Sequence, residues 1–168
     1  QLPRLSLVWP VGPMFDDDEP PLDILATVLG DGKSSRLYRK LVYELQIARD
    51  VSVSNYSQEI AGEFTLQVTA SPGHSLEEIQ EVAEAELERI RTEPPGDREM
   101  ARARNRFESH HIRFLERVGG FGGRADQLNH YNVFARDPGF INEDLQRYMT
   151  VTSEDVVRVA ANTLGGDR

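Results

Sequence analysis

The 168-residue chain contains no cysteine, which excludes disulfide bonds, thiolate metal sites and a cysteine nucleophile. It has no apolar run of membrane-spanning length, so we expect no transmembrane helix. Basic residues are few, with 19 Lys and Arg against 28 Asp and Glu, and the formal net charge is -9. Because phosphate contacts need clustered Lys and Arg, this balance argues against nucleic-acid binding.

The motif H-x-x-E-H is also absent, which on a helix would place two imidazoles and a carboxylate on one face. The four histidines are His74, His110, His111 and His130. His110 and His111 are adjacent, so on a helix they diverge by about 100° and do not share a metal. Glu108 and His111 form E-x-x-H, but one carboxylate and one imidazole fall short of a site. We therefore predict no metal ligand and no catalytic residue in this chain.

Three short patterns resemble functional sites but have simpler explanations. Gly32-Lys33-Ser34 matches the end of a phosphate loop, but Thr27 stands where that loop needs a glycine, and a helix end is favoured. The cluster Gly119–Gly123 favours a kink or a close helix crossing over a hinge or a substrate-facing loop. The acidic run Asp16–Glu19 is typical of a solvated loop, with weak cation binding as the alternative.

The first part of the chain combines a strand pattern with two helical patterns. Residues 4–9 alternate, with Leu5, Leu7 and Trp9 on one side, which predicts a strand. Residues 22–29 have helical spacing, and Gly30 and Gly32 end that helix. A second helix is expected to about residue 45, capped by Ser34 or Ser35.

Two runs with a period of two follow. In residues 47–57, one side is predicted to carry Ile47, Arg49, Val51, Val53 and Asn55, and the other side Ala48, Asp50, Ser52, Ser54 and Tyr56. In residues 63–70, the side chains that face together are Phe64, Leu66, Val68 and Ala70. These runs predict an antiparallel pair with a turn near residues 59–62.

The chain after Pro72 is helical in pattern. Ser75 and Glu78 form a capping box that opens a helix, which ends before Pro94. A long helix is expected from about residue 97 through 118, with further helical segments at 124–134, 142–148 and 153–164. We expect Ser153 to cap the last of these helices.

These elements predict an α/β fold (strictly α+β), a small mostly antiparallel sheet covered by helices, in one domain over residues 1–168. The strands are few for so many helices, which leaves the sheet with an unpaired edge. That edge would suit a homodimer or a further strand from a longer protein. The missing initiator Met also predicts a fragment of a longer multi-domain protein.

The segment Gly32–Val51, G-K-S-S-R-L-Y-R-K-L-V-Y-E-L-Q-I-A-R-D-V, resembles the metal-free domains of insulinase-like (pitrilysin-family) zinc metallopeptidases. Three later pieces resemble the same family, namely P-G-H-S-L-E-E-I, L-E-R-V-G-G-F-G-G-R-A-D-Q-L-N and D-P-G-F-I-N-E-D-L-Q-R-Y. In order and spacing these pieces cover nearly the whole chain. The resemblance implies a processing-peptidase-like half-domain that is catalytically inactive.

Proteins of that family build a clamshell in which one domain binds zinc through H-x-x-E-H and its metal-free relatives close over the peptide. The resemblance therefore implies a non-catalytic, substrate-enclosing domain of a bacterial zinc-dependent endopeptidase. Its partners would be a peptide substrate and a homologous zinc-bearing domain of the same parent chain, where the zinc cofactor belongs. An extracytoplasmic (periplasmic) location is also implied. The alternative is a structural or assembly domain without proteolytic activity, like the core subunits of respiratory complexes.

Metal-free domains of the family often carry an Arg and, seven residues later, a Tyr that help to hold the peptide at the zinc. An ungapped comparison places Val42 at the Arg position and Arg49 at the Tyr position, so this chain lacks the pair. A guanidinium donates several hydrogen bonds. Arg49 is therefore the candidate substrate contact, with a role different from that of the tyrosine.

Overall fold

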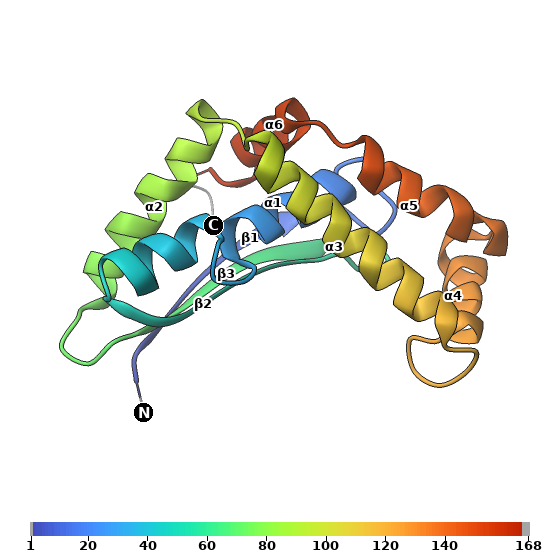
Figure 1. The fold of residues 1–168 in the computed structure, drawn as a ribbon, viewed down its shortest axis with the longest axis horizontal. Coiled ribbons are helices and arrows are strands. Elements are labelled where there is room, and N and C mark those ends of the chain that lie inside the picture. Colours follow the sequence, from blue (N-terminus) through green and yellow to red (C-terminus); the bar gives the residue numbers. More distant parts are fainter. Residues whose placement is uncertain (1, 166–168) are drawn as a thin grey trace.

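The computed structural model describes residues 2–165 and contains a three-stranded sheet with its helices on one side (Figure 1). The strands are β1 (Arg4–Val11), β2 (Ala48–Tyr56) and β3 (Gly62–Ala70), in the spatial order β1-β3-β2. Both outer strands pair antiparallel with β3. The predicted fold class and the predicted antiparallel pair are confirmed.

The sheet buries one face and leaves the other polar. On the buried face, the four predicted side chains of β3 are fully buried, namely Phe64, Leu66, Val68 and Ala70. Three side chains of β1 are buried beside them, namely Leu5, Leu7 and Trp9. On the opposite face, Ser6, Ser52 and Ser54 are exposed. In Figure 1 the helices of the described chain lie over the apolar face, which is where the core forms.

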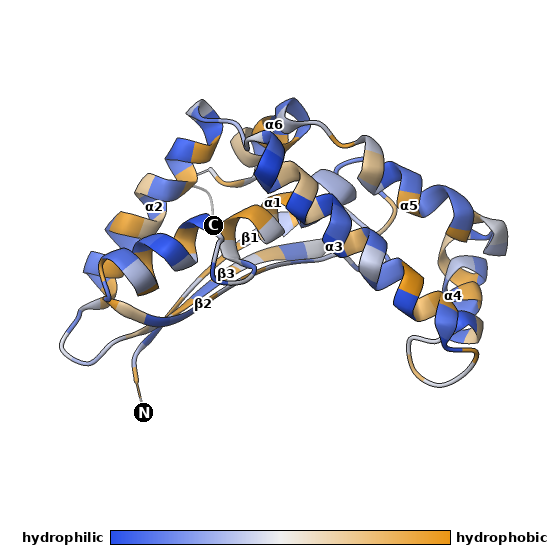
Figure 2. Cartoon of the chain, in the orientation of Figure 1, coloured by the Kyte–Doolittle hydropathy of each residue, from blue (hydrophilic) through white to orange (hydrophobic). Residues whose placement is uncertain are grey.

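Helix α1 (Glu19–Gly30) lies at the centre of the helical layer. Nearly every residue from Pro20 to Gly30 is buried, and the helix contacts β2, α3, α5 and α6. Figure 2 shows hydrophobic residues along α1 and along the strands beneath it. Gly30 permits the close contact with the sheet, because a Cβ at this position would lie 2.3 Å from Val53 Cγ2.

The other helices are α2 (Leu76–Thr92), α3 (Asp97–Glu116), α4 (Arg124–His130), α5 (Ile141–Thr150) and α6 (Ser153–Thr163), with a 3-10 turn, η3 (Pro138–Phe140). The predicted cap of α2 is confirmed, since the Ser75 hydroxyl accepts a 3.1 Å hydrogen bond from the Glu78 N–H. The glycine cluster forms a loop between α3 and α4 rather than a kink within one helix. Gly120 and Gly122 have positive φ there, which suits glycine.

One predicted helix cap is wrong, and another is correct in position alone. Ser35 directly precedes the first helical residue, Arg36, and its carbonyl accepts a 3.0 Å hydrogen bond from the Arg39 N–H. Its hydroxyl, however, donates to the Gly32 carbonyl at 2.8 Å and stabilises the turn before the helix. The helix that follows, η1 (Tyr38–Glu44), has π geometry, and a π-helical segment, η2 (Tyr131–Ala135), also extends α4. At α6 the cap is Thr152, one residue before Ser153, and it forms a reciprocal capping box with Asp155.

The predicted alternation in β2 is wrong at its beginning. Ala48 pairs with Ala70 and Asp50 pairs with Thr69, so Arg49 is the extra residue of a β-bulge. The bulge shifts the side-chain phase by one residue. Ala48 and Val51 are therefore both buried, although the simple alternation placed them on opposite sides, and Arg49 is exposed.

Candidate functional site

A groove of about 620 Å³, called here the strand-edge groove, lies between β2, α1 and α3. Its walls come from all three elements, and among them are Val53, Ser54 and Asn55 from β2, Asp23 and Thr27 from α1, and Arg102, Phe107 and His110 from α3. Within the described residues β2 pairs only with β3. The strand therefore has a free edge, whose backbone N–H and C=O groups are available to a further extended segment.

Asp23 is the buried carboxylate of this groove. Its Oδ2 accepts a 2.7 Å hydrogen bond from the Tyr148 hydroxyl, and its Oδ1 accepts a 3.2 Å hydrogen bond from Asn55 Nδ2. The other amide atom, Asn55 Oδ1, is buried and has no hydrogen-bond partner among the described residues. These bonds join α1, β2 and α5 at one point.

Asp23 belongs to a larger cluster, the α1–α5 acidic cluster, which consists of Glu19, Asp23, Tyr131, Asp144, Arg147 and Tyr148. In it, the Tyr131 hydroxyl donates to Asp144 at 2.7 Å. Arg147 donates to Asp144 at 3.0 Å and lies 3.6 Å from Glu19. One guanidinium thus faces three carboxylates, which leaves the cluster short of positive charge.

The protonation of the cluster follows from this shortage. Burial raises the pKa of Asp23 to about 6, although hydrogen bonds from Tyr148 and Asn55 oppose the shift. Burial also raises the pKa of Glu19 to about 7, and the neighbouring Asp23 adds to the increase. Desolvation raises the pKa of Tyr148 well above its ordinary value, so its hydroxyl remains a hydrogen-bond donor. The cluster can take up protons near neutral pH, and it holds α5 against α1.

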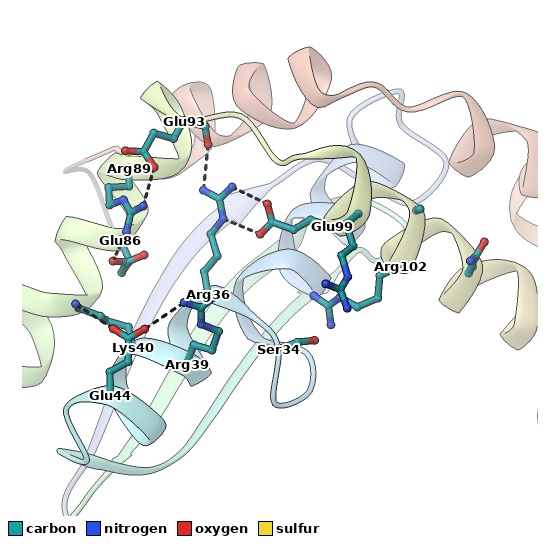
Figure 3. A pocket seen from close by; sticks show the side chains of 13 residues that line it. Ser34, Arg36, Arg39, Lys40, Glu44, Glu86, Arg89, Glu93, Glu99 and Arg102 are labelled. Carbon is teal, nitrogen blue, oxygen red and sulfur yellow. Dashed lines mark hydrogen bonds and ion pairs between the residues drawn. The ribbon is translucent and has the colours of Figure 1, made fainter.

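A second groove of about 900 Å³, called here the charged groove, lies between η1, α2 and α3. Figure 3 shows Arg36 at its centre. Arg36 donates two 2.9 Å hydrogen bonds to the Glu99 carboxylate and one of 3.0 Å to the Glu93 carbonyl. The pKa of Glu99 lies below its ordinary value because Arg36 bonds to its charged form. This bidentate pair fixes the wall of the groove.

Arg49, the substrate contact expected from the sequence, lines neither groove. It lies exposed at the bulge of β2, beside the first residues of that strand. His110 lines the strand-edge groove and packs edge-on against Phe114, with ring centroids 4.2 Å apart. Burial lowers the pKa of His110, so its neutral form is favoured.

The described residues do not fit a zinc site. Within residues 2–165, no group of three His, Cys, Asp or Glu side chains is placed to hold a metal ion. Glu108 and His111 both lie on α3 and belong to no such group. The helices in this range also include none that is long and apolar enough to span a membrane.

Sequence reasoning missed both grooves and the α1–α5 acidic cluster. The cluster joins residues that are far apart in the chain, such as Asp23 and Tyr148. One signal was present, because Asp23 interrupts the apolar run Leu22–Leu29 and a charged residue on a buried helix needs a partner. Nothing in the sequence indicated which tyrosine would donate the hydrogen bond to Asp23.

Comparison with known proteins agrees with this fold. The family model described as Peptidase M16 inactive domain matches residues 1–107. No curated protein matches the sequence significantly. Among solved structures, a protease from Helicobacter pylori superposes with a TM-score of 0.83 at 22% identity, covering 96% of this chain and 38% of that chain.

Two further structures have the same fold. One is the inactive peptidase domain of a protein named "putative zinc protease" from Bordetella parapertussis, with a TM-score of 0.79 at 20% identity. The match covers 99% of this chain and 89% of that domain. The other belongs to complex III2 from Candida albicans with Inz-5 bound, with a TM-score of 0.76 at 14% identity over 97% of this chain and 40% of that chain.

The chain therefore spans little more than a third of the Helicobacter pylori protease but most of the isolated Bordetella domain. At these identities the structures show a common fold. The family model, in contrast, matches residues 1–107 of the 168, which is more than half of the chain. The chain belongs to the peptidase M16 inactive-domain family, which confirms the resemblance to the metal-free domains of insulinase-like peptidases.

Proposed function

We propose that this chain is a non-catalytic domain that encloses the peptide substrate of a zinc-dependent endopeptidase. A homologous domain that carries H-x-x-E-H would supply the zinc, which polarises the scissile carbonyl and activates water. Membership of the inactive-domain family supports this role. The single observation that carries the proposal is the free edge of β2, which borders a groove of about 620 Å³.

The strand-edge groove suits an extended peptide for two reasons. An extended segment can pair with the free backbone groups of β2, which gives affinity without dependence on the peptide sequence. The adjacent wall of α3 provides both apolar and polar contacts, since Phe107, His110 and Arg102 line it. A domain with this geometry would hold a peptide in an extended form. Water activated at a neighbouring metal centre could then attack the scissile carbonyl.

Arg49 fits this role as an auxiliary contact. The β-bulge exposes its guanidinium on the same strand whose edge is free. A peptide that extends along β2 beyond the groove would place a backbone carbonyl near this end of the strand, and a guanidinium is a strong donor to such a group. We include Arg49 in the proposed peptide-binding surface on this ground.

The test combines this chain with a polypeptide from the same organism that carries H-x-x-E-H and belongs to the same family. The rate of peptide cleavage is measured for each component and for the mixture. We expect cleavage to increase in the mixture, because the second domain encloses the peptide. An unchanged rate, with both components folded and associated, would refute the proposed role.

Two matched variants assign the effect to the groove. Ser54 lines the strand-edge groove and Ser52 does not, although both are exposed on β2. We expect Ser54→Tyr to reduce cleavage by the mixture and Ser52→Tyr to leave it unchanged. Arg49→Ala should raise KM, with Arg4→Ala on β1 as its exposed control. Equal effects within each pair would contradict the assignment.

A second candidate function is that of a scaffold domain without a proteolytic role. The similarity to a chain of complex III2 favours it, because that fold also occurs in a respiratory assembly. Association with a homologous chain that itself lacks H-x-x-E-H would support the scaffold. Increased cleavage in the mixture above would exclude it.

A further inference from the structure

The charged groove differs in charge from the rest of the molecule. Six cationic side chains line it, namely Arg36, Arg39, Lys40, Arg89, Arg98 and Arg102, against the four carboxylates of Glu44, Glu86, Glu93 and Glu99. The whole chain, in contrast, has a formal net charge of -9. A local excess of positive charge in a concave site attracts anions.

The four carboxylates of the groove are already engaged by neighbouring cations. Glu99 accepts two hydrogen bonds from Arg36 (Figure 3) and a third from the Gly96 N–H. Arg89 contacts both Glu86 and Glu93, at 3.2 and 2.7 Å. Glu44 is shared by Arg39 and Lys40, each at 3.3 Å. The acidic side chains therefore form ion pairs within the walls of the groove. The excess positive charge lies on the cations that form no such ion pair.

Two cations of the groove form no ion pair. Among residues 2–165, no acidic side chain lies within ion-pair distance of Arg98 or Arg102, although the charge of Arg102 contributes to the lowered pKa of Glu99. These residues are four apart on α3, and both line the groove, so their guanidinium groups lie on one side of the helix. Arg39 also retains capacity, because it is largely exposed and has one long contact with a carboxylate that Lys40 shares.

The Arg102 guanidinium is held in position before any ligand binds. It donates to the carbonyls of Asp31 at 2.8 Å and Thr27 at 3.3 Å, which belong to the C-terminal end of α1. These bonds use part of the guanidinium fork and leave other N–H groups for a ligand. Ser34 and Asn105 supply neutral hydrogen-bonding groups to the same groove. A preorganised donor set of this kind lowers the cost of binding.

We propose that the charged groove binds an acidic peptide segment whose Asp or Glu carboxylates contact Arg98 and Arg102. Guanidinium groups bind carboxylates through paired hydrogen bonds, and they are favoured for this purpose over lysine. A volume of about 900 Å³ accommodates several residues rather than a single small ion. The charged groove adjoins the strand-edge groove, since Arg102 and Asn105 line both, but Arg98 lines the charged groove alone. The inference does not depend on the proposed role in proteolysis.

The test is calorimetric titration of the whole chain with a short peptide of alternating Glu and Gly. The control peptide has Lys in place of Glu. We expect the Glu peptide to bind and the Lys peptide not to bind. The affinity for the Glu peptide should fall strongly between about 50 mM and about 500 mM NaCl, because salt screens exposed charges. Inorganic phosphate serves as a competitor. Displacement of the peptide by phosphate at equal concentration would mean that the site is a small-anion site and would overturn the proposal.

Arg98→Glu is the variant that tests the residues. Arg98 is exposed on α3 and engages no carboxylate of the described chain, so the change should leave the fold intact. We expect the affinity for the Glu peptide to fall on the order of tenfold, since a charge-assisted contact becomes a repulsion. Arg4→Glu on β1 makes the same change in net charge away from the groove, and we expect less than a twofold effect.

The remaining outcomes are also decisive. Equal losses in Arg98→Glu and Arg4→Glu would show that the peptide responds only to overall charge. Equal binding of the Glu and Lys peptides, or no binding of the Glu peptide at low salt, would refute the site. Circular dichroism of both variants confirms that each comparison is made between folded proteins.

Discussion

The replacement Asp23→Asn tests the energetics at the base of the strand-edge groove. Asp23 is buried, and burial raises its pKa from 3.8 to about 6. The folded state therefore binds the proton more tightly than the unfolded state does. The free energy of unfolding should fall as the pH rises from the unfolded pKa to the folded pKa, and an Asn side chain, which does not titrate, removes this dependence.

The magnitude follows from the shift in pKa. A shift of about 2 units corresponds to about 3 kcal/mol, because each unit is worth about 1.4 kcal/mol. Roughly half of that amount, about 1.5 kcal/mol, is lost between pH 5 and pH 8, since the unfolded carboxyl is already ionised at pH 5. Glu19 adds a loss of the same sign in this window, with its pKa raised from 4.5 to about 7.

The Asn side chain can keep the local hydrogen bonds. Its oxygen still accepts from the Tyr148 hydroxyl, which now donates to Asp23 at 2.7 Å. Its nitrogen would face Asn55 Nδ2, but a flip of the Asn55 amide brings the unpartnered Oδ1 into that position. The comparison therefore isolates the buried charge.

The assay is urea-induced unfolding of the native chain and of Asp23→Asn at pH 5 and pH 8, with the exposed Asp50→Asn as the matched control. We expect the native chain to lose more stability than Asp23→Asn across this interval, with a difference of about 1.5 kcal/mol or more. The excess arises because removal of the Asp23 charge also lowers the pKa of Glu19. Equal losses of unfolding free energy between pH 5 and pH 8 in the native chain and in Asp23→Asn would refute this explanation. A reduction of the pH dependence in Asp50→Asn as large as that in Asp23→Asn would also refute it.

Two further substitutions test the packing of α1 and the capping of α2. Gly30→Ala gains about 1 kcal/mol of helix propensity, but its Cβ would lie 2.3 Å from Val53 Cγ2 and 2.7 Å from the Val53 backbone nitrogen. We expect Gly30→Ala to lower the free energy of unfolding by about 1–2 kcal/mol, measured in urea. The control Gly119→Ala should be nearly neutral, because its Cβ meets open space. A Gly30→Ala variant that is more stable than the native chain would contradict the contact with Val53. Ser75→Ala removes the cap of α2 and should cost about 1 kcal/mol, and an unchanged unfolding midpoint would show that the cap contributes nothing.

Local features of the fold could be predicted from the sequence because they depend on neighbouring residues. The alternation in β3 predicted its buried face, and the pair Ser75 and Glu78 predicted the start of α2. The bulge at Arg49 could not be predicted, since a strict period of two fits the same residues and only the pairing with β3 reveals the extra one. The π geometry of η1 has no signature that distinguishes it from an α-helical spacing.

The grooves could not be predicted because they arise between elements that are distant in the chain. Arg36 and Glu99 are bonded to each other in the wall of the charged groove, yet 63 positions separate them in the chain. Arg36 belongs to a helical pattern that is rich in charge, and such patterns are usually solvated. The strand-edge groove likewise depends on how α3 crosses α1, and helix crossing is set by tertiary packing.

Zinc content and peptidase activity of the chain, measured alone and then with a family member that carries H-x-x-E-H, decide whether this domain is catalytically inactive. We expect no bound zinc and no cleavage by the chain alone, and faster cleavage by the mixture than by the partner alone. Stoichiometric zinc or cleavage by the chain alone would show that the domain is itself a peptidase.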